Sequence, residues 1–502
     1  MSMDAQNSSI NSNSPNQKTS ERLGFFAMLT NASVALVNRY LPSPFVFSIM
    51  LTLIAFVAAI LVTGQGIIDV AGSWGKGLWS LHGFAMQMAL ILVTGYAFAN
   101  APFIQKLLNG IASQIRSPNM AIMMATLVGL VGSWLNWGFG LVIGAVFAKA
   151  LAKQVKGVDY PLLVAAAYSG FLVWHGGLAG SIPLTLSTGG ETLAKLSAGA
   201  MSDAVPISQT LFAGYNLFIV GLLLLVLPIL NRLMHPKTPT VIDATLLKDS
   251  DDALPAKDTP AQKLDDSRWI AGVLLVFAGM YYVSEFGQSG FSLGLDIVIG
   301  LFLFIGLLSH GTLERYYRAV GSGIGGITGI VLLFPFYGGI MGIMTAVDAD
   351  GVSISTQVTQ FFVDFASAES LPVLAFLSAG LVNVFVPSGG GQFAVQGPVM
   401  LPASIELGVD PVVTAMAIAW GDAWTNMIQP FWALPLLGIA GLDARAIMGY
   451  CLIILLVSGI IISGVFWLAV LPLIRPIFIV INRFYYYFLS LLSFVVIKRS
   501  KL

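Results

Sequence analysis

One stretch constrains the fold of this 502-residue chain more than any other, because it interrupts an apolar region with glycines. Two apolar runs, 371–386 and 393–403, flank the segment Pro387-Ser-Gly-Gly-Gly-Gln392. Proline and glycine are the two least favourable residues in a helix interior, so we expect the helix to break here. At membrane depth, the backbone groups freed by a break are tolerated only when they are buried in protein or line a wet cavity. The sequence therefore predicts a re-entrant hairpin whose tip reaches a binding site.

Composition places the chain in a membrane. It is 57% hydrophobic and 10% charged, with a mean hydropathy of +0.85, whereas soluble domains carry about a quarter charged residues. Its 53 glycines and 23 prolines suit a transporter with interrupted helices. The formal net charge is zero, so nothing indicates a nucleic-acid partner. The single Cys451 and four scattered histidines predict neither a structural disulfide nor a metal site.

The first spans set the expected orientation. Residues 1–20 are rich in Ser, Asn and Gln and are predicted to be a disordered tail. Lys18, Arg22 and Arg39 precede the first apolar run, 41–62, which predicts a cytoplasmic N-terminus. A loop then leads to a second span at 81–101, which is followed by an interfacial amphipathic helix at 104–115.

A second interrupted stretch lies in the first half of the chain. Residues 120–148 are apolar and are broken at Asn136-Trp-Gly-Phe-Gly140, with Arg116 before them and Lys149 after them. Basic residues on both sides predict that both ends are cytoplasmic. A full in-and-out pair needs about forty residues, so we favour a hairpin that enters from the inside. A pair of short, tilted spans remains the alternative.

The rest of each half follows the same pattern. An apolar run at 162–174 breaks at 175–183, a mixed outer loop covers 189–210, and a span at 211–230 leads into a polar linker. The second half has spans at 269–284, 293–308 and 324–344, a turn with His310, Arg315 and Arg318, and an acidic loop at 348–369 that lacks basic residues. That loop has the charge of an outer loop, so the hairpin at 371–403 is predicted to enter from outside. A broken span with its break at 422–430 and a last span at 446–470 follow.

The order span, span, hairpin, broken span, span thus occurs twice. The turn Gly157-Val-Asp-Tyr-Pro161 is echoed by Gly408-Val-Asp-Pro411. We therefore predict an all-α polytopic membrane protein with two inverted-topology repeats, each with a re-entrant hairpin and an interrupted helix, which is typical of secondary transporters. The predicted segments are the tail 1–20, the first repeat 21–230, the cytoplasmic linker 231–268, the second repeat with one extra span 269–472, and an additional apolar segment 473–502, in which 477–497 could span.

The breaks offer neutral polar groups and no cation. No Lys or Arg lies in either apolar hairpin or in the broken spans, so an anion there would be held by half-helix N-termini and amide or hydroxyl donors. Such donors suit one carboxylate, whereas di- and tricarboxylates more often recruit Arg. The candidate substrate- and ion-binding residues are Asn136, Gly138, Gly140, His175, Ser181, Asn383, Ser388, Gly389, Gly390, Gly391, Gln392, Gln396, Asp422, Asn426 and Gln429. For any single Asn, Ser or Gln, satisfying freed backbone groups is the favoured alternative.

Two ionisable residues stand out within the apolar spans. Asp422 lies some ten residues into a span, where a carboxylate is costly and is a functional hypothesis by default. It could coordinate a cation, carry a coupled proton, or cap the following half-helix. His175 could titrate near neutrality, although a hydrogen bond to backbone is favoured. The tryptophans and Phe431 near the breaks are interpreted as packing.

Several motifs resemble one known family. They are Met86-Gln-Met-Ala-Leu-Ile, Asn136-Trp-Gly-Phe-Gly-Leu-Val, Asp159-Tyr-Pro-Leu-Leu, Val386-Pro-Ser-Gly-Gly-Gly, Gln396-Gly-Pro, Gln429-Pro-Phe-Trp-Ala-Leu-Pro and Ile447-Met-Gly-Tyr-Cys451. Together they closely resemble the bacterial short-chain fatty acid transporter family. The resemblance implies uptake of acetoacetate or butyrate across the bacterial inner membrane, and a distant relationship to the ion-transporter superfamily, whose members often couple to Na⁺ or H⁺. His175 departs from the pattern, because it stands where another glycine is expected.

The sequence therefore favours a Na⁺- or H⁺-coupled importer of small monocarboxylates, with the lipid bilayer as its surroundings and no other cofactor. A cation/proton antiporter or a carrier of another organic anion on the same scaffold remains the alternative. A polytopic membrane enzyme is the distant one, since such enzymes gather His, Asp and Glu or Arg at one membrane face. A homo-oligomer is left open.

Overall fold

The computed structural model describes residues 25–241, 259–289 and 295–471, and every regular element within them is helical. Eight segments in these ranges are long and apolar enough to cross a membrane. The predicted class, an all-α polytopic membrane protein, is confirmed. The predicted tail at 1–20 and the apolar segment at 473–502 lie outside the described residues, as does part of the linker, 242–258.

The first half of the chain begins with α1 (Phe25–Tyr40) and then forms one series of helices. In order these are α2 (Pro44–Thr63), α3 (Ile67–Gly77), α4 (His82–Ala99), α5 (Pro102–Ala112), α6 (Pro118–Leu135), α7 (Trp137–Gln154), α8 (Tyr160–Ser169), the 3₁₀ segment η1 (Gly170–Gly176), α9 (Ser181–Thr188), α10 (Gly190–Leu196) and α11 (Gly214–Leu233).

The second half repeats this series after two intervening helices, α12 (Pro260–Asp265) and α13 (Arg268–Ser289). In order its elements are α14 (Leu295–His310), α15 (Leu313–Gly323), η3 (Ile324–Ile327), α16 (Thr328–Thr345), α17 (Ile354–Asp364), α18 (Leu371–Phe385), α19 (Gly389–Glu406), α20 (Pro411–Thr425), η4 (Asn426–Ile428), α21 (Pro430–Ala440) and α22 (Arg445–Val470).

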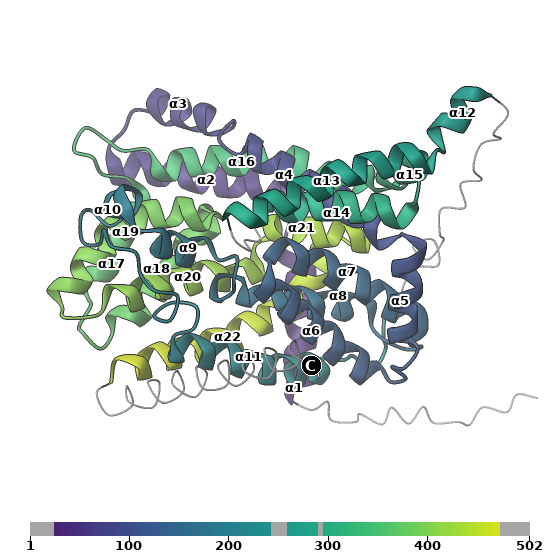
Figure 1. Cartoon of the computed structure of the whole chain (residues 1–502). Coiled ribbons are helices and arrows are strands. Elements are labelled where there is room, and N and C mark those ends of the chain that lie inside the picture. Colours follow the sequence, from purple (N-terminus) through teal and green to yellow (C-terminus); the bar gives the residue numbers. More distant parts are fainter. Residues whose placement is uncertain (1–24, 242–258, 290–294, 472–502) are drawn as a thin grey trace, which may run out of the picture.

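Equivalent helices of the two copies make equivalent contacts with the other copy. One helix of each copy packs against the first two helices of the other copy. In the first copy α4 packs against α14 and α15, and in the second copy α16 packs against α2 and α3. In Figure 1 the long helices run between two ends of the molecule, with α3 and α17 at the left and their counterparts α15 and α5 at the right. This reciprocal arrangement is expected of copies related by a twofold axis. Their opposite orientation in a bilayer stays a prediction.

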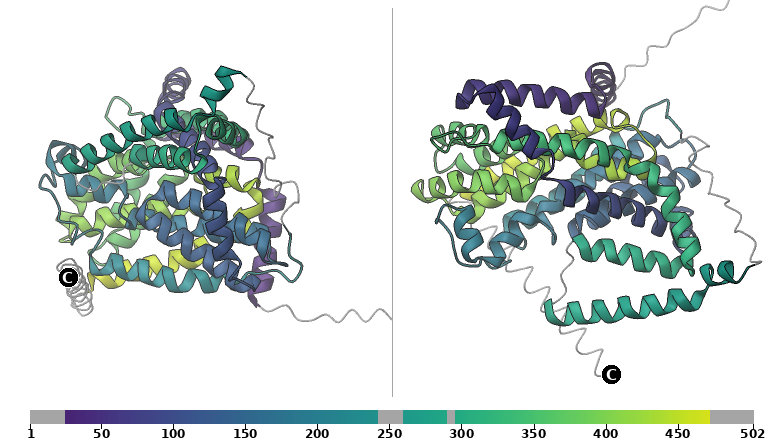
Figure 2. Two further views of the ribbon diagram at one scale, coloured as in Figure 1. Left: turned by 45° about the vertical axis from the view of Figure 1, so that its right-hand side comes forward. Right: turned by 90° about the horizontal axis from the view of Figure 1, so that it is seen from above.

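The extra helix α13 lies at the edge of the bundle. Figure 2 shows it running along the outside of the molecule when seen from above. Its apolar side chains are largely exposed, for example Trp269 at 87% and Val283 at 76%. In a membrane protein such a face is expected to contact lipid or another subunit.

Four predicted loops or turns contain helices instead. The loop that carries Asp69 forms α3, the turn that carries Arg315 forms α15, the acidic loop at 348–369 contains α17, and the outer loop at 189–210 contains α10. These helices are short and amphipathic, so they carry no long apolar run. Side-chain caps mark the starts of two of them. Thr312 caps α15, and Ser353 accepts from the Thr356 amide at 3.1 Å ahead of α17, in the pattern of a capping box.

Candidate functional site

The two broken spans meet at their interruptions. Each contains a 3₁₀ segment, η1 in the first copy and η4 in the second, and α20 packs directly against η1. The backbone freed at the first break is satisfied by the first hairpin, because the Leu178 amide donates to the Trp134 carbonyl at 2.8 Å. At the second break, the Asn426 carbonyl accepts from the Tyr168 hydroxyl at 2.6 Å. Each break is therefore braced by the rest of the bundle.

His175 and Asp422 come together where the breaks meet. The imidazole Nδ1 of His175 lies 2.8 Å from the Ala419 carbonyl oxygen and 3.0 Å from Asp422 Oδ2, and both side chains are fully buried. Asp422 was predicted to open the second break, and this is wrong. It lies inside α20, which continues to Thr425, because tertiary packing of this buried helix outweighs the weak helix propensity of Gly421.

The Asp422 carboxylate lacks the partners that a buried charge requires. Neither oxygen accepts a hydrogen bond from a described residue, since the Nδ1–H of His175 is directed at the Ala419 carbonyl rather than at Oδ2. Removing a carboxylate from water costs several kcal/mol unless paired charges and hydrogen bonds offset it. The arrangement is therefore suited to gaining a cation or a proton.

The state of His175 is partly fixed by its neighbours. A carbonyl can only accept, so Nδ1 carries a proton. Nε2 lies 2.8 Å from the Ser181 hydroxyl, which can donate to a neutral imidazole or accept from a charged one. The hydrogen bond between Nε2 and Ser181 can therefore be made in either direction.

The tip of the second hairpin reaches the same place. A Cβ built on Gly389 would lie 2.5 Å from both His175 Nε2 and the Ser181 hydroxyl, whereas one built on Gly390 would meet nothing within 4 Å. The three glycines were predicted to interrupt a helix, but the interruption lies just before them, at 386–388. They form the first turn of α19, capped by Ser388, whose hydroxyl accepts from the Gly391 amide at 3.3 Å. The conformational cost of glycine applies to a helix interior, so glycine is tolerated at this end.

Three predicted amide side chains hold the second break together. The amide nitrogen of Asn383 lies 2.8 Å from the Asp422 carbonyl, 2.9 Å from the Thr425 hydroxyl and 2.8 Å from Asn426 Oδ1. The amide of Gln429 donates to the Val384 carbonyl at 2.8 Å. These side chains thus satisfy backbone groups at the break, which was the favoured alternative to binding a ligand. The remaining atoms Asn383 Oδ1, Asn426 Nδ2 and Gln429 Oε1 are buried without a hydrogen-bond partner among the described residues.

Two further predicted residues lie between the arms of the second hairpin. Gln392 donates to the Ala379 carbonyl at 2.8 Å and to Gln396 Oε1 at 2.9 Å, and Gln396 donates to the Ser378 hydroxyl at 2.9 Å. Both are fully buried. These hydrogen bonds connect α19 to α18 and do not involve His175 or Asp422.

The first hairpin tip has a tightly packed turn. Asn136 caps α7 by accepting from the amides of Gly138 at 2.9 Å and Phe139 at 3.1 Å. A Cβ on Gly140 would collide with Ser133 of the facing arm. The ring of Trp137 lies 6.2 Å from that of Trp174, which stacks on His175 at 3.6 Å. The two hairpin tips are therefore joined through Trp174 and His175.

Sequence reasoning missed a second link between the breaks. Asn216 of α11 donates to the Gly176 carbonyl at 3.1 Å and accepts from the indole of Trp420 at 2.8 Å. The signal in the sequence was an amide side chain within the apolar run 211–230, and the structure shows that Asn216 is fully buried.

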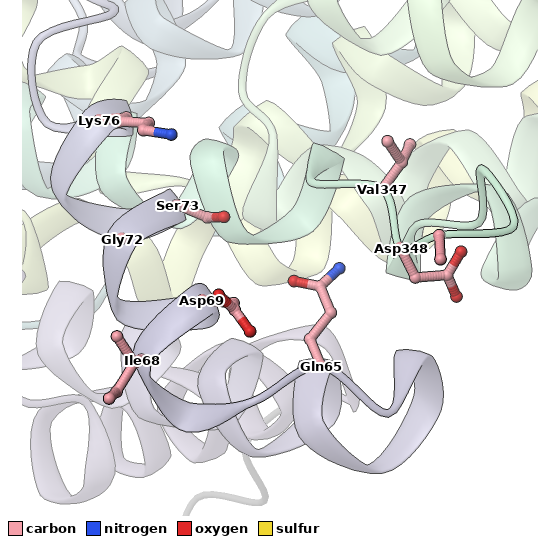
Figure 3. Close-up of a pocket in the computed structure, with 9 residues that line it drawn as sticks. Gln65, Ile68, Asp69, Gly72, Ser73, Lys76, Val347 and Asp348 are labelled. Carbon is pink, nitrogen blue, oxygen red and sulfur yellow. The ribbon is translucent and has the colours of Figure 1, made fainter.

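A separate polar pocket of about 430 Å³ lies between α3 and the loop after α16. Figure 3 shows Asp69, Ser73 and Lys76 on α3, with Gln65 before it and Asp348 across from it. It shares no lining residue with the His175–Asp422 junction. A smaller apolar pocket of about 160 Å³ lies beside α2 and α18.

Comparison with known proteins gives consistent matches. The profile of the family described as "Short chain fatty acid transporter" matches residues 25–469. A candidate short-chain fatty acid transporter of Escherichia coli K12 is 42% identical over 430 residues, covering 85% of this chain and 96% of that protein. A candidate short-chain fatty acid transporter of Haemophilus influenzae is 41% identical over 440 residues, covering 86% and 97%. The crystal structure of the Alcanivorax borkumensis YdaH transporter aligns with a TM-score of 0.42 at 15% identity, covering 86% of this chain and 98% of that one.

Proposed function

The chain belongs to the short-chain fatty acid transporter family, and on that premise we propose that it imports small monocarboxylates such as butyrate or acetoacetate together with a proton or Na⁺. The resemblance read from the sequence motifs is confirmed. The family is one of transporters, in agreement with the prediction that the chain is not an enzyme. Substrate and coupling go beyond family membership and are argued from the site.

The substrate class follows from the charges at the breaks. Neither the broken spans nor the two hairpin tips carry Lys or Arg. A substrate with two or three carboxylates would leave most of its charge without a partner in a low-dielectric site. One carboxylate can be held by amides at half-helix N-termini, by hydroxyls and by indoles. Uptake of a monocarboxylate is the function these groups serve best.

The observation that carries the coupling proposal is the contact between His175 and Asp422. Both groups can exchange protons, they lie 3.0 Å apart, and they come from the broken spans of different copies. A bound anion would add negative charge beside a buried carboxylate, so a cation must enter with it to keep the site near neutrality. The imidazole, with an Nε2 that tolerates either state, favours a proton over Na⁺. Co-entry of a proton and a carboxylate is a symport.

The site also favours symport over the antiporter alternative. The Ser181 hydroxyl links His175 to the Gly389 tip, where the amides of α19 begin. An anion bound beside His175 and a proton on its imidazole would attract each other. An antiporter would instead have proton and substrate compete for one site.

Uptake into proteoliposomes tests the function. Purified protein is reconstituted, and labelled butyrate uptake is followed with an inward proton gradient, with an inward Na⁺ gradient, or with neither. Protein-free vesicles give the passive leak of the undissociated acid. We expect the proton gradient to drive accumulation well above that leak. Stimulation by Na⁺ alone would reassign the coupling ion, and absence of protein-dependent uptake would overturn the proposed function.

The chain is a multi-pass membrane protein. We further propose that it resides in the bacterial inner membrane with its N-terminus in the cytoplasm. Arg39 and the other basic residues ahead of the first span support this orientation. The two-copy organisation, with the segment 231–268 as linker, is proposed on the repeated order of elements.

A further inference from the structure

Two tryptophans from different copies face one another beside the His175–Asp422 junction. Trp174 lies in η1 and Trp432 in the first turn of α21, and their ring centroids are 5.8 Å apart. Each side chain is 3% exposed. Trp174 also stacks on the imidazole of His175, with centroids 3.6 Å apart and planes inclined by 20°. The indole pair, Trp174 and Trp432, therefore lies next to the proposed proton site.

The walls around the indole pair are aromatic. The ring of Trp432 lies 5.4 Å from Phe171, 5.5 Å from Trp137 and 5.7 Å from Phe84. These rings come from η1, from the first hairpin tip and from α4. Elements from both copies thus meet in one aromatic enclosure.

The two N–H groups of the indole pair lack a partner among the described residues. Nε1 of Trp174 and Nε1 of Trp432 are buried and make no hydrogen bond with any described residue. Buried indoles usually find an acceptor, and two others in the same broken span do so. Trp420 donates to Asn216 Oδ1 at 2.8 Å, and Trp424 donates to the Leu455 carbonyl at 2.7 Å. Trp74 and Trp134 also have buried indole N–H groups without a partner in the described ranges, so the pair is set apart by position: its two N–H groups belong to neighbouring rings beside the breaks.

We propose that the indole pair is the carboxylate-binding subsite for the transported acid, an inference that rests on the proposed function. The carboxylate would accept from the two indole N–H groups, and the short alkyl chain would lie against Phe171, Trp137 and Phe84. This assignment replaces the earlier interpretation of these aromatics as packing. Neutral donors against apolar walls bind one carboxylate with a short tail and reject polar or doubly charged acids.

The same geometry connects the substrate with the proton. Trp174 is adjacent in sequence to His175 and stacked on it, so an acid held by its indole lies beside the imidazole. The elements packed here carry few ionisable groups: His175 and Asp422 face the junction, and Tyr168, on α8, has its hydroxyl bound to the Asn426 carbonyl. A carboxylate at the indole pair thus meets no competing fixed positive charge.

The test removes the N–H and keeps a ring. W174F and W432F are reconstituted, and the concentration dependence of butyrate uptake is measured for each. The control is W74F, because Trp74 of α3 also has a buried, unpaired indole N–H but lies against Phe336, away from the breaks. We expect KM to rise about tenfold in W174F and in W432F, since a hydrogen bond to a charged group is lost, and to stay unchanged in W74F.

The outcomes separate this inference from the proposed function. Wild-type KM in both W174F and W432F, with butyrate still transported, would overturn the subsite and leave the function intact. An equal rise in W74F would show a general effect of losing an indole, and would also overturn it. If a variant fails to fold, indole fluorescence of the wild-type protein is titrated with butyrate and with butyramide. We expect a saturable change with butyrate alone, and no change with butyrate would contradict the subsite.

Discussion

His175 Nδ1 and Asp422 Oδ2 lie 3.0 Å apart at the point where the interrupted helices of the two copies meet. The contact joins an imidazole from the first break to a carboxylate in α20, and both are fully buried. Any movement of one copy against the other changes the surroundings of this pair. On the proposed function, a proton bound there would be linked to the relative position of the copies.

Replacing His175 with Gln is expected to uncouple transport. Gln can keep a hydrogen bond near the Ala419 carbonyl but cannot carry a proton. We expect proton-driven butyrate uptake to fall at least about tenfold, a loss typical of removing a group that handles a proton. H82Q is the control, since His82 is exposed at the start of α4. Unchanged driven uptake in H175Q would exclude His175 from coupling.

Two adjacent glycines are expected to differ in their tolerance of a methyl group. In G389A the added Cβ would press against His175 and Ser181, whereas in G390A it would meet open space. Overpacking of this kind costs about 1–3 kcal/mol. We expect a lower unfolding temperature for G389A and little change for G390A, measured by thermal unfolding in detergent. Equal unfolding temperatures would mean that Gly389 does not press on the His175–Ser181 contact.

The matched turns of the two copies offer a comparison of stability. Asp159 is 2% exposed and accepts from the amides of Leu162 and Thr240, both at 2.8 Å, and from the Tyr450 hydroxyl at 3.2 Å. Asp410 is exposed and accepts from the Val412 amide at 2.9 Å.

We therefore expect D159N to destabilise the protein by about 2–4 kcal/mol, since a buried charged acceptor is removed. D410N should cost about 1 kcal/mol or less, as for a single cap. Chemical denaturation followed by indole fluorescence measures both. A loss from D410N as large as that from D159N would contradict the assigned contacts.

Opposite insertion of the copies is tested by labelling from one side. Lys106 of α5 and Asp364 of α17 are exposed and lie on corresponding helices of the two copies. In K106C and D364C, a membrane-impermeant thiol reagent should label one position from each side in oriented vesicles. The native Cys451 is fully buried and gives little background. Labelling of both positions from the same side would exclude an inverted repeat.

Sequence patterns located the long apolar helices and the breaks between them, because apolar length and helix-breaking residues are local properties. The break near Pro387 and the cap at Asn136 could be found from Pro, Gly and Asn alone. The amphipathic helices α3, α15 and α17 were missed because they lack an apolar run of spanning length. The buried faces of α3 and α15 are defined by partners from the other copy, α16 and α4, and that of α17 is defined by α18 and α19.

The candidate site was predicted as a set of residues but not as an arrangement. Asp422 and His175 were each singled out as ionisable groups in apolar spans, yet their pairing depends on how α20 crosses η1. The sequence also could not show which indole N–H groups lack an acceptor, since Trp432 and Trp424 lie in similar sequence surroundings. They differ only in whether a carbonyl, such as that of Leu455, lies within reach.

Gradient-driven butyrate uptake by D422N tests the central claim most directly. Asparagine keeps the shape of the side chain but can neither bind a proton nor pair with a charged imidazole. D443N, which alters an exposed carboxylate paired with Arg445, is the matched control. We predict uptake at the protein-free level for D422N and normal uptake for D443N, with both variants folded. Proton-driven accumulation by D422N at the wild-type level would contradict the account.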